Sequence, residues 1–212
     1  MHFSEIVLAL LKGLAVTLQI AVGAWVLSVV LGIILGILTD MGARPVQWFV
    51  RVLVTLLRSI PQLVLLYLLY FGVGSLGLNV PAVVAAIVAL GMTESAFASE
   101  YYRAALMTVP PDQREAGKSL GFSPIKVFVL IVLPQAVPYA LAPLLNSFIS
   151  LAKLATLAAA VGSPEILYTG QSMIQLTGEI TLIILLIIAI YIAFSVPLSR
   201  VVRRLDARIE RQ

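Results

Sequence analysis

Long apolar stretches alternate with short polar ones along the whole chain of 212 residues. A hydrocarbon core of about 30 Å needs about 20 helical residues to cross it, and five of the apolar stretches reach that length. We expect membrane spans at residues 10–38, 52–71, 81–106, 125–152 and 180–199. The pattern therefore predicts an all-α integral membrane protein, with residues 1–212 forming one transmembrane domain and a polar loop at 107–124 between the third and fourth spans.

Composition also indicates a membrane protein, and it limits the kinds of functional site that the chain can form. Hydrophobic residues make up 61% of the chain and charged residues 11%, whereas soluble domains carry roughly 25% charged residues. The chain has no cysteine and one histidine, which excludes disulfides and thiolate metal sites. We therefore expect no metal, no cofactor and no catalytic activity in this chain.

The first apolar stretch carries small residues at four-residue spacing, namely Ala24, Ser28, Gly32 and Gly36. Residues four apart lie on one face of a helix, and small side chains there let a second helix approach closely. The ladder predicts a tight helix–helix contact along this face.

Arginine and proline residues mark irregular places in the later spans. Arg58 and Pro61 lie within the second span, where arginine usually extends toward the membrane surface and proline usually marks a kink, so we assign both a structural role. Pro134, Pro138 and Pro143 fall in the fourth span. Three prolines predict an irregular passage of the kind that lines a cavity.

Charged and polar residues at membrane depth are the candidates for a transport path. Glu94 lies near the middle of the third span, and a carboxylate there is costly unless it faces the bundle interior or a wet cavity. Asn146 and Lys153 lie in the fourth span. We expect these three residues to face a substrate path, although structural pairing of Glu94 and extension of Lys153 to the membrane surface stay open as alternatives. Glu100 and Arg103 are expected to form an ion pair on the helix surface.

The polar loop at 107–124 predicts a short helix outside the membrane core. Pro111 suits the first turn of a helix, Asp112 and Glu115 are favourable near its start, and Gly121 would end it.

Orientation follows from the basic residues, because cytoplasmic loops are enriched in Lys and Arg. Five spans place twelve basic residues on one side and only Lys12 and Lys153 on the other. The twelve are Arg44, Arg51, Arg58, Arg103, Arg114, Lys118, Lys126, Arg200, Arg203, Arg204, Arg208 and Arg211. The N-terminus is predicted outside, and the C-terminus and the 107–124 loop in the cytoplasm.

The stretch EAGKSLGFSPIKVFVLIVLP resembles the EAA loop of permease subunits of bacterial ATP-binding-cassette (ABC) importers. That pattern reads Glu-Ala-Ala, three residues, Gly, nine residues, Ile, one residue, Leu-Pro. The matching residues in this chain are Glu115, Ala116, Gly121, Ile131, Leu133 and Pro134. Only the third position departs, with Gly117 in place of alanine.

Nearly the whole chain is similar to the polar amino acid branch of these permeases. Arg58, Pro61 and the Tyr70-Phe71-Gly72 run fit that branch's Arg-Gly-Thr-Pro segment and the Tyr-Phe-Gly after it. Two departures concern the path: Leu154 stands where an acidic residue usually follows the lysine, and Glu94 stands where a small or polar residue is usual.

The resemblance implies a MetI-like permease fold of the type I ABC importers in a bacterial inner membrane. It further implies that the EAA segment is a coupling helix docked on a cytoplasmic ATPase dimer, which binds ATP and Mg. The coupling residues would be Arg114, Glu115, Ala116, Gly117, Lys118 and Gly121. The other implied partners are a second, identical or paralogous permease subunit, an extracytoplasmic substrate-binding protein and a polar amino acid or similar zwitterion.

Two other classes of protein are weighed against this one. A self-sufficient secondary transporter or channel would normally show internal repeats and more helices. A membrane scaffold without a substrate path would leave Glu94 and the three prolines of the fourth span unexplained.

Overall fold

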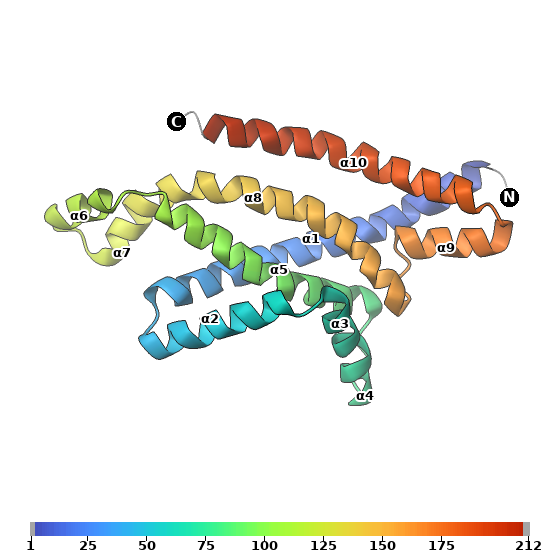
Figure 1. Cartoon of the computed structure of the whole chain (residues 1–212), viewed down its shortest axis with the longest axis horizontal. Coiled ribbons are helices and arrows are strands. Elements are labelled where there is room, and N and C mark those ends of the chain that lie inside the picture. Colours follow the sequence, from blue (N-terminus) through green and yellow to red (C-terminus); the bar gives the residue numbers. More distant parts are fainter. Residues whose placement is uncertain (1–2, 210–212) are drawn as a thin grey trace.

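The computed structural model describes residues 3–209, which form helices joined by short turns and contain no strand (Figure 1). In order, the helices are α1 (Phe3–Met41), α2 (Arg44–Ser59), α3 (Gln62–Tyr67), the π-helical turn η1 (Leu68–Gly72), α4 (Val73–Ser75), α5 (Ala82–Met107), α6 (Pro111–Ser119), α7 (Pro124–Val127), the π-helical turn η2 (Phe128–Val132), α8 (Leu133–Leu154), the 3₁₀ helix η3 (Ala155–Val161), α9 (Ile166–Thr177) and α10 (Ile180–Ile209).

Four helical segments are long and apolar enough to cross a membrane, namely Phe3–Thr39, Ala82–Met107, Pro124–Val161 and Ile180–Ala207. A fifth span exists only if the bent pair Arg44–Ser59 and Gln62–Ser75 counts as one. The all-helical membrane architecture is therefore confirmed. The second span, expected at 52–71, corresponds to this bent pair, which begins earlier, at Arg44.

The break in the second span lies at Ile60 and Pro61. The two helical parts meet at 99°, and both linking residues are extended, with ψ of 126° at Ile60 and 132° at Pro61. A residue before proline is pushed out of the helical region, and proline has no N–H to continue the hydrogen-bond ladder. The kink expected at Pro61 is thus confirmed, and it is sharper than a kink within one helix. The connection between the spans expected at 10–38 and 52–71 is mostly helical, because α1 ends at Met41 and α2 begins at Arg44.

The small-residue face of α1 packs against α5, as predicted. Ala24 and Ser28 are fully buried. A Cβ atom on Gly32 would lie 2.6 Å from the Cβ of Ala98 and 3.2 Å from the carbonyl oxygen of Ser95. Contact this close requires a residue without a side chain, so the spacing of small residues sets how near the two helices come.

The two glycines of this face differ in a way that can be tested. We expect Gly32→Ala to destabilise the protein by about 1–3 kcal/mol, because the added methyl meets a side chain and backbone that cannot rotate away. Gly36→Ala is the matched control: its Cβ would lie 3.7 Å from its nearest neighbours, an ordinary contact, and alanine favours the helix by about 1 kcal/mol. Thermal unfolding of both variants in detergent checks the prediction, and equal stability would contradict it.

Proline shapes the fourth span mainly at its start. Pro134 follows the π-helical turn η2, as expected where a proline cannot donate to the carbonyl four residues before it. The Gln135 side-chain amide donates to the Ile131 carbonyl at 2.7 Å. Pro138 and Pro143 lie inside α8, which continues through them. The irregular helix geometry expected in this span is therefore found in η2, just before Pro134.

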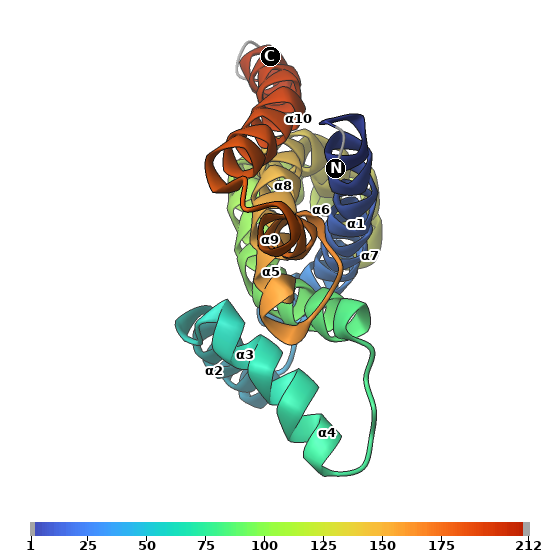
Figure 2. The same cartoon turned by 90° about the vertical axis from the view of Figure 1, so that its right-hand side faces the viewer.

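The remaining helices are arranged around the α1–α5 contact. Figure 2 shows α2, α3 and α4 projecting from the bundle on one side and α10 lying at the opposite edge. Ile183 and Ile187 of α10 pack with Ile166 of α9 and with Ile6 and Leu10 of α1.

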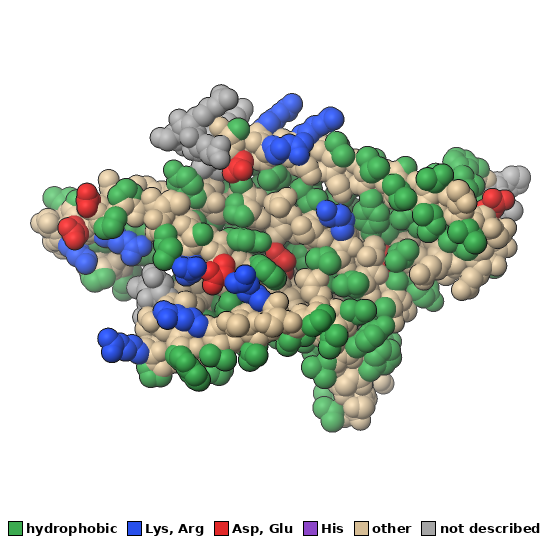
Figure 3. Space-filling view, in the orientation of Figure 1, with side chains coloured by type: hydrophobic (Ala, Val, Ile, Leu, Met, Phe, Trp, Pro, Cys, Tyr) green, Lys and Arg blue, Asp and Glu red, His purple; other side chains and the backbone are tan. Residues whose placement is uncertain are grey.

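Basic side chains gather toward the end of the bundle that holds α6, α7, the start of α2 and the C-terminal part of α10 (Figure 3). Two members of the predicted basic set cannot be placed this way. Arg211 lies outside the described residues, and the side chain of Arg208 is not described.

Candidate functional site

The predicted short helix is present as α6, between the end of α5 and the start of α7. Pro111 occupies its first turn and Lys118 its last, positions that suit proline geometry and the helix dipole. Glu115, Ala116 and Lys118 are exposed. They form a polar surface at the tip of the bundle that the rest of the chain leaves uncovered.

Gly117 anchors the opposite face of α6. It is buried, and a Cβ atom there would lie 2.7 Å from Ile131 Cδ1 and 2.9 Å from Val127 Cγ2. The departure from the Glu-Ala-Ala pattern therefore has a local explanation: without a side chain at 117, α6 packs directly against η2. Ile131 belongs to the same sequence pattern, so two of its positions meet in this contact.

Gly121 ends α6 in a left-handed conformation, with φ of +78°. Its N–H donates to the Lys118 carbonyl at 2.9 Å, and the Phe122 N–H donates to the Gly117 carbonyl at 3.2 Å. These two bonds form a Schellman motif, which favours glycine at the left-handed position. Nothing lies within 4 Å of a Cβ at Gly121, so glycine is required by the backbone conformation and not by space.

Arg114 lies apart from its exposed neighbours on α6. It is half-buried and lines a cavity with Arg51 of α2 and Arg103 of α5. Its guanidinium therefore belongs to the junction of α6 with the bundle, and Glu115 and Lys118 carry the exposed charge of the helix.

The three residues expected on a substrate path come from α5 and α8. Glu94 is 6% exposed, and the Ser147 hydroxyl lies within hydrogen-bonding reach of its carboxylate. Asn146 and Lys153, one heptad apart on α8, are both exposed. The structure thus brings Glu94 to the part of α8 that holds Ser147, the residue after Asn146 in the chain. Within the described residues no ion pair joins Glu94 to Lys153, which lies roughly 9 Å further along the helix axis than Ser147.

Arg58, at the end of α2, also contacts α5. Its guanidinium carbon lies 5.0 Å from the centre of the Phe97 ring, and Phe97 is three residues after Glu94 on the same helix. This cation–π contact stabilises the end of α2 against α5 just before the bend at Pro61. The structural role expected for Arg58 is compatible with this position.

Sequence reasoning missed a buried carboxylate at Glu165. Its side chain is fully buried, accepts from the Tyr168 N–H at 2.7 Å and lies 3.4 Å from the Thr17 hydroxyl. The Ile166 N–H donates in turn to Thr17 Oγ1 at 3.1 Å. Burial raises the pKa of Glu165 above its ordinary value, and its hydrogen bonds act in the opposite direction.

This cluster fastens the start of α9 to α1. Gly13 permits the contact, because a Cβ atom there would lie 2.9 Å from Ile166 Cα. A signal was present in the sequence: an acidic residue after Ser163 and Pro164, directly before an apolar run, is typical of a helix N-cap.

We expect Glu165→Leu to lower the free energy of unfolding by about 1–3 kcal/mol, because the Tyr168 N–H loses its acceptor, whereas the Thr17 hydroxyl can still donate to the Gly13 carbonyl at 3.1 Å. Glu165→Gln is the control and is expected to cost less, since its amide oxygen can still accept from Tyr168. Thermal unfolding in detergent measures both, and equal losses would show that the acceptor is unimportant.

Comparison with known proteins places this architecture in a defined class. A family model described as binding-protein-dependent transport system inner membrane component matches residues 7–211. The chain therefore belongs to this family of membrane permease components.

Individual relatives agree with this assignment. A probable amino-acid ABC transporter permease of Sinorhizobium fredii is 32% identical, over 96% of this chain and 88% of its own length. The probable glutamine ABC transporter permease GlnM of Bacillus subtilis is 31% identical, over 92% of this chain and 90% of its own. Together with the family, these relatives identify the chain as a permease of an ABC importer.

Solved structures support the same fold. A crystal structure of an amino acid ABC transporter with histidines superposes with a TM-score of 0.90 and 26% identity, covering 98% of this chain and 99% of that one. An inward-facing structure of the MetNI methionine ABC transporter gives a TM-score of 0.74 at 22% identity, covering 97% and 99%. At this low identity, the similarity to the MetNI transporter is evidence for a shared fold alone.

Proposed function

We propose that this chain is the permease subunit of an ATP-driven importer for a polar amino acid or a similar zwitterion in a bacterial inner membrane. The supporting observation is the agreement of relatives named for amino acids with a buried carboxylate, Glu94, inside an otherwise apolar bundle. Intramembrane carboxylates are rare and usually mark substrate or ion pathways.

The path is proposed to pass Glu94, Asn146 and Lys153. Glu94 can attract an ammonium group, and Lys153, exposed in this single chain, can attract a carboxylate on the same ligand. Opposite charges at the two ends of the path suit a zwitterion better than a simple ion.

Coupling to ATP hydrolysis is proposed to run through α6. Glu115 and Lys118 offer exposed charges to an ATPase, and the contact of Gly117 with Ile131 and Val127 transmits movement of α6 to the fourth span. Under the proposed orientation, with the N-terminus outside and the C-terminus in the cytoplasm, α6 faces the cytoplasmic ATPase dimer that binds ATP and Mg. This chain itself is proposed to have no catalytic role.

The proposed importer also contains a second permease subunit, identical or paralogous. An extracytoplasmic binding protein delivers the substrate to it. Asn146 and Lys153 are left uncovered by this chain, as expected of residues that face a path formed between two subunits.

Reconstitution tests this function directly. Proteoliposomes containing the chain, its ATPase and a candidate binding protein are expected to accumulate a labelled polar amino acid only when ATP is supplied on the cytoplasmic side. Uptake that persists without the ATPase would favour a secondary transporter. Absence of uptake for a full panel of amino acids, with the ATPase and binding protein both bound, would contradict the proposal.

A further inference from the structure

An arginine-lined cavity opens where α1, α2, α5 and α6 meet. Its volume is about 640 Å³, and its charged lining residues are Arg51, Arg103, Arg114 and Glu100. Three arginines and one glutamate line the cavity, so the lining carries an excess of positive charge. Gly36 and Thr39 of α1 complete one wall.

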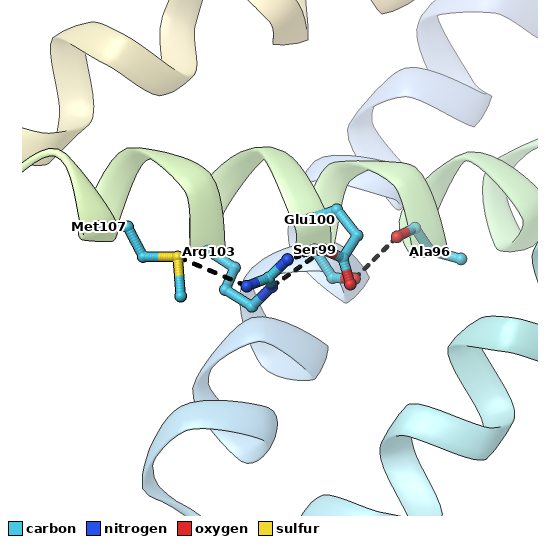
Figure 4. A network of polar contacts seen from close by, with 5 residues as sticks. All are labelled: Ala96, Ser99, Glu100, Arg103 and Met107. Carbon is cyan, nitrogen blue, oxygen red and sulfur yellow. Dashed lines mark hydrogen bonds and ion pairs between the residues drawn. The ribbon is translucent and has the colours of Figure 1, made fainter.

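Most of that positive charge is not neutralised by side chains that the structure describes. Glu100 is engaged by Arg103, whose Nε and Nη2 lie 2.9 and 2.7 Å from the same carboxylate oxygen (Figure 4). Arg51 has a long contact of 3.5 Å with the Gln47 side chain. Among the described side chains, neither Arg51 nor Arg114 has a carboxylate partner.

An apolar groove lies directly beside the cavity. Its volume is about 310 Å³, and it runs between α1, α5 and the η2–α8 segment. Phe128, Val137 and Ala140 are among its lining residues, and Gly36 and Leu106 line both the groove and the cavity. A positively charged cavity and an apolar groove therefore share a border at the end of the α1–α5 contact.

We propose that the cavity and groove together bind one anionic phospholipid, with its phosphate at Arg51, Arg103 and Arg114 and an acyl chain in the groove. Guanidinium groups bind phosphate oxygens in a bidentate manner, and basic pockets between membrane helices on the cytoplasmic side suit anionic headgroups. A soluble anion could bind to the arginines but has no acyl chain to occupy the groove.

The site would act on the coupling helix. Arg114 belongs to α6, whereas Arg51 and Arg103 belong to α2 and α5, so a shared phosphate would hold α6 against the body of the bundle. The inference rests on the proposed function in one respect, the cytoplasmic position of this end of the bundle. The binding itself is measured without transport.

The test is lipid binding to the full-length chain in detergent, followed by native mass spectrometry. Phosphatidylglycerol is compared with phosphatidylethanolamine of the same acyl chains. We expect phosphatidylglycerol to bind about tenfold more tightly or better, and the double variant Arg51→Gln/Arg114→Gln to lose about tenfold or more, because each basic residue contributes about fivefold near an anionic headgroup. Lys126→Gln, which removes an exposed charge outside the cavity, is the matched control and is expected to keep the preference.

Three results would overturn the proposal. They are equal binding of the two lipids, an equal loss in Lys126→Gln, and displacement of phosphatidylglycerol by inorganic phosphate at comparable concentration, which would indicate a soluble anion. Unfolding temperatures measured without added lipid must match between the variants, so that lost binding is not lost folding. If the chain binds the lipid but imports no amino acid with its ATPase and binding protein both bound, the proposed function is refuted and the lipid site is not.

Discussion

Replacing Gly121 with leucine is expected to reduce the substrate imported per ATP hydrolysed by about fivefold or more. Gly121 has φ of +78°, and an L-residue in that conformation costs roughly 1–2 kcal/mol. The strain falls on the two bonds that end α6, from Gly121 to Lys118 and from Phe122 to Gly117. Under the proposed coupling role, a loosened turn lets α6 move without moving the fourth span. The measurement is uptake and ATP hydrolysis in the same proteoliposomes.

Gly121→Asn supplies the matched control. Asparagine tolerates the left-handed region better than other residues with a side chain, and the space around a Cβ at 121 is open. The asparagine variant should therefore keep most of the coupling, and the leucine variant should lose it although both add bulk. Unaltered transport by Gly121→Leu would refute the assignment of this glycine, and equal losses in both variants would point to side-chain bulk instead of backbone strain.

A close helix contact along one face of α1 could be predicted from sequence because it depends on a local regularity, whereas its partner, α5, is known only from the structure. Small residues at four-residue spacing lie on one helix face whatever the rest of the chain does, and Gly32 against Ala98 realises that expectation. The short helix α6 was predictable for the same reason. Proline at its start and glycine at its end act through their own backbone preferences.

The bend before α3 was predictable in position but not in size. Proline at 61 interrupts the hydrogen-bond ladder, and this follows from sequence alone. The angle of 99° depends on where α2 packs, including the contact of Arg58 with Phe97. That contact joins residues 39 positions apart, and no local pattern encodes it.

The charged cavity was hidden for a related reason. Arg51 stands 52 positions before Arg103 in the chain, and it joins Arg103 and Arg114 only because α2 packs beside α5. In the sequence they are only three of the twelve basic residues that predict the cytoplasmic side, and nothing in the sequence shows that they meet. Glu165 was overlooked because it stands in a Gly-Pro segment that resembles an exposed loop, whereas the contact of Gly13 with Ile166 buries it.

Replacing Glu94 with glutamine is expected to lower uptake by about tenfold or more while leaving the protein folded. Glutamine keeps the shape of the side chain and its place beside the Ser147 hydroxyl but removes the charge. Hydrogen bonds to charged groups contribute about 1.5–3 kcal/mol, so the loss of one to a substrate ammonium corresponds to roughly a 10- to 100-fold change. Removing a charge from the bundle interior should leave the unfolding temperature unchanged or raise it.

Comparing uptake with unfolding temperature shows whether Glu94 contacts the substrate or only stabilises the fold. If Glu94 serves only to bind Ser147, then Glu94→Gln should retain uptake and Ser147→Ala should impair folding to a similar degree as Glu94→Ala. If Glu94 meets the substrate, then Glu94→Gln should lose uptake at an unchanged unfolding temperature, and Ser147→Ala should retain most of it. Glu179→Gln, which removes an exposed carboxylate between α9 and α10, is expected to behave as the parent protein. The proposed substrate path would have to be abandoned if Glu94→Gln transported as well as this control, because the carboxylate is the feature that distinguishes Glu94 from the residues packed around it.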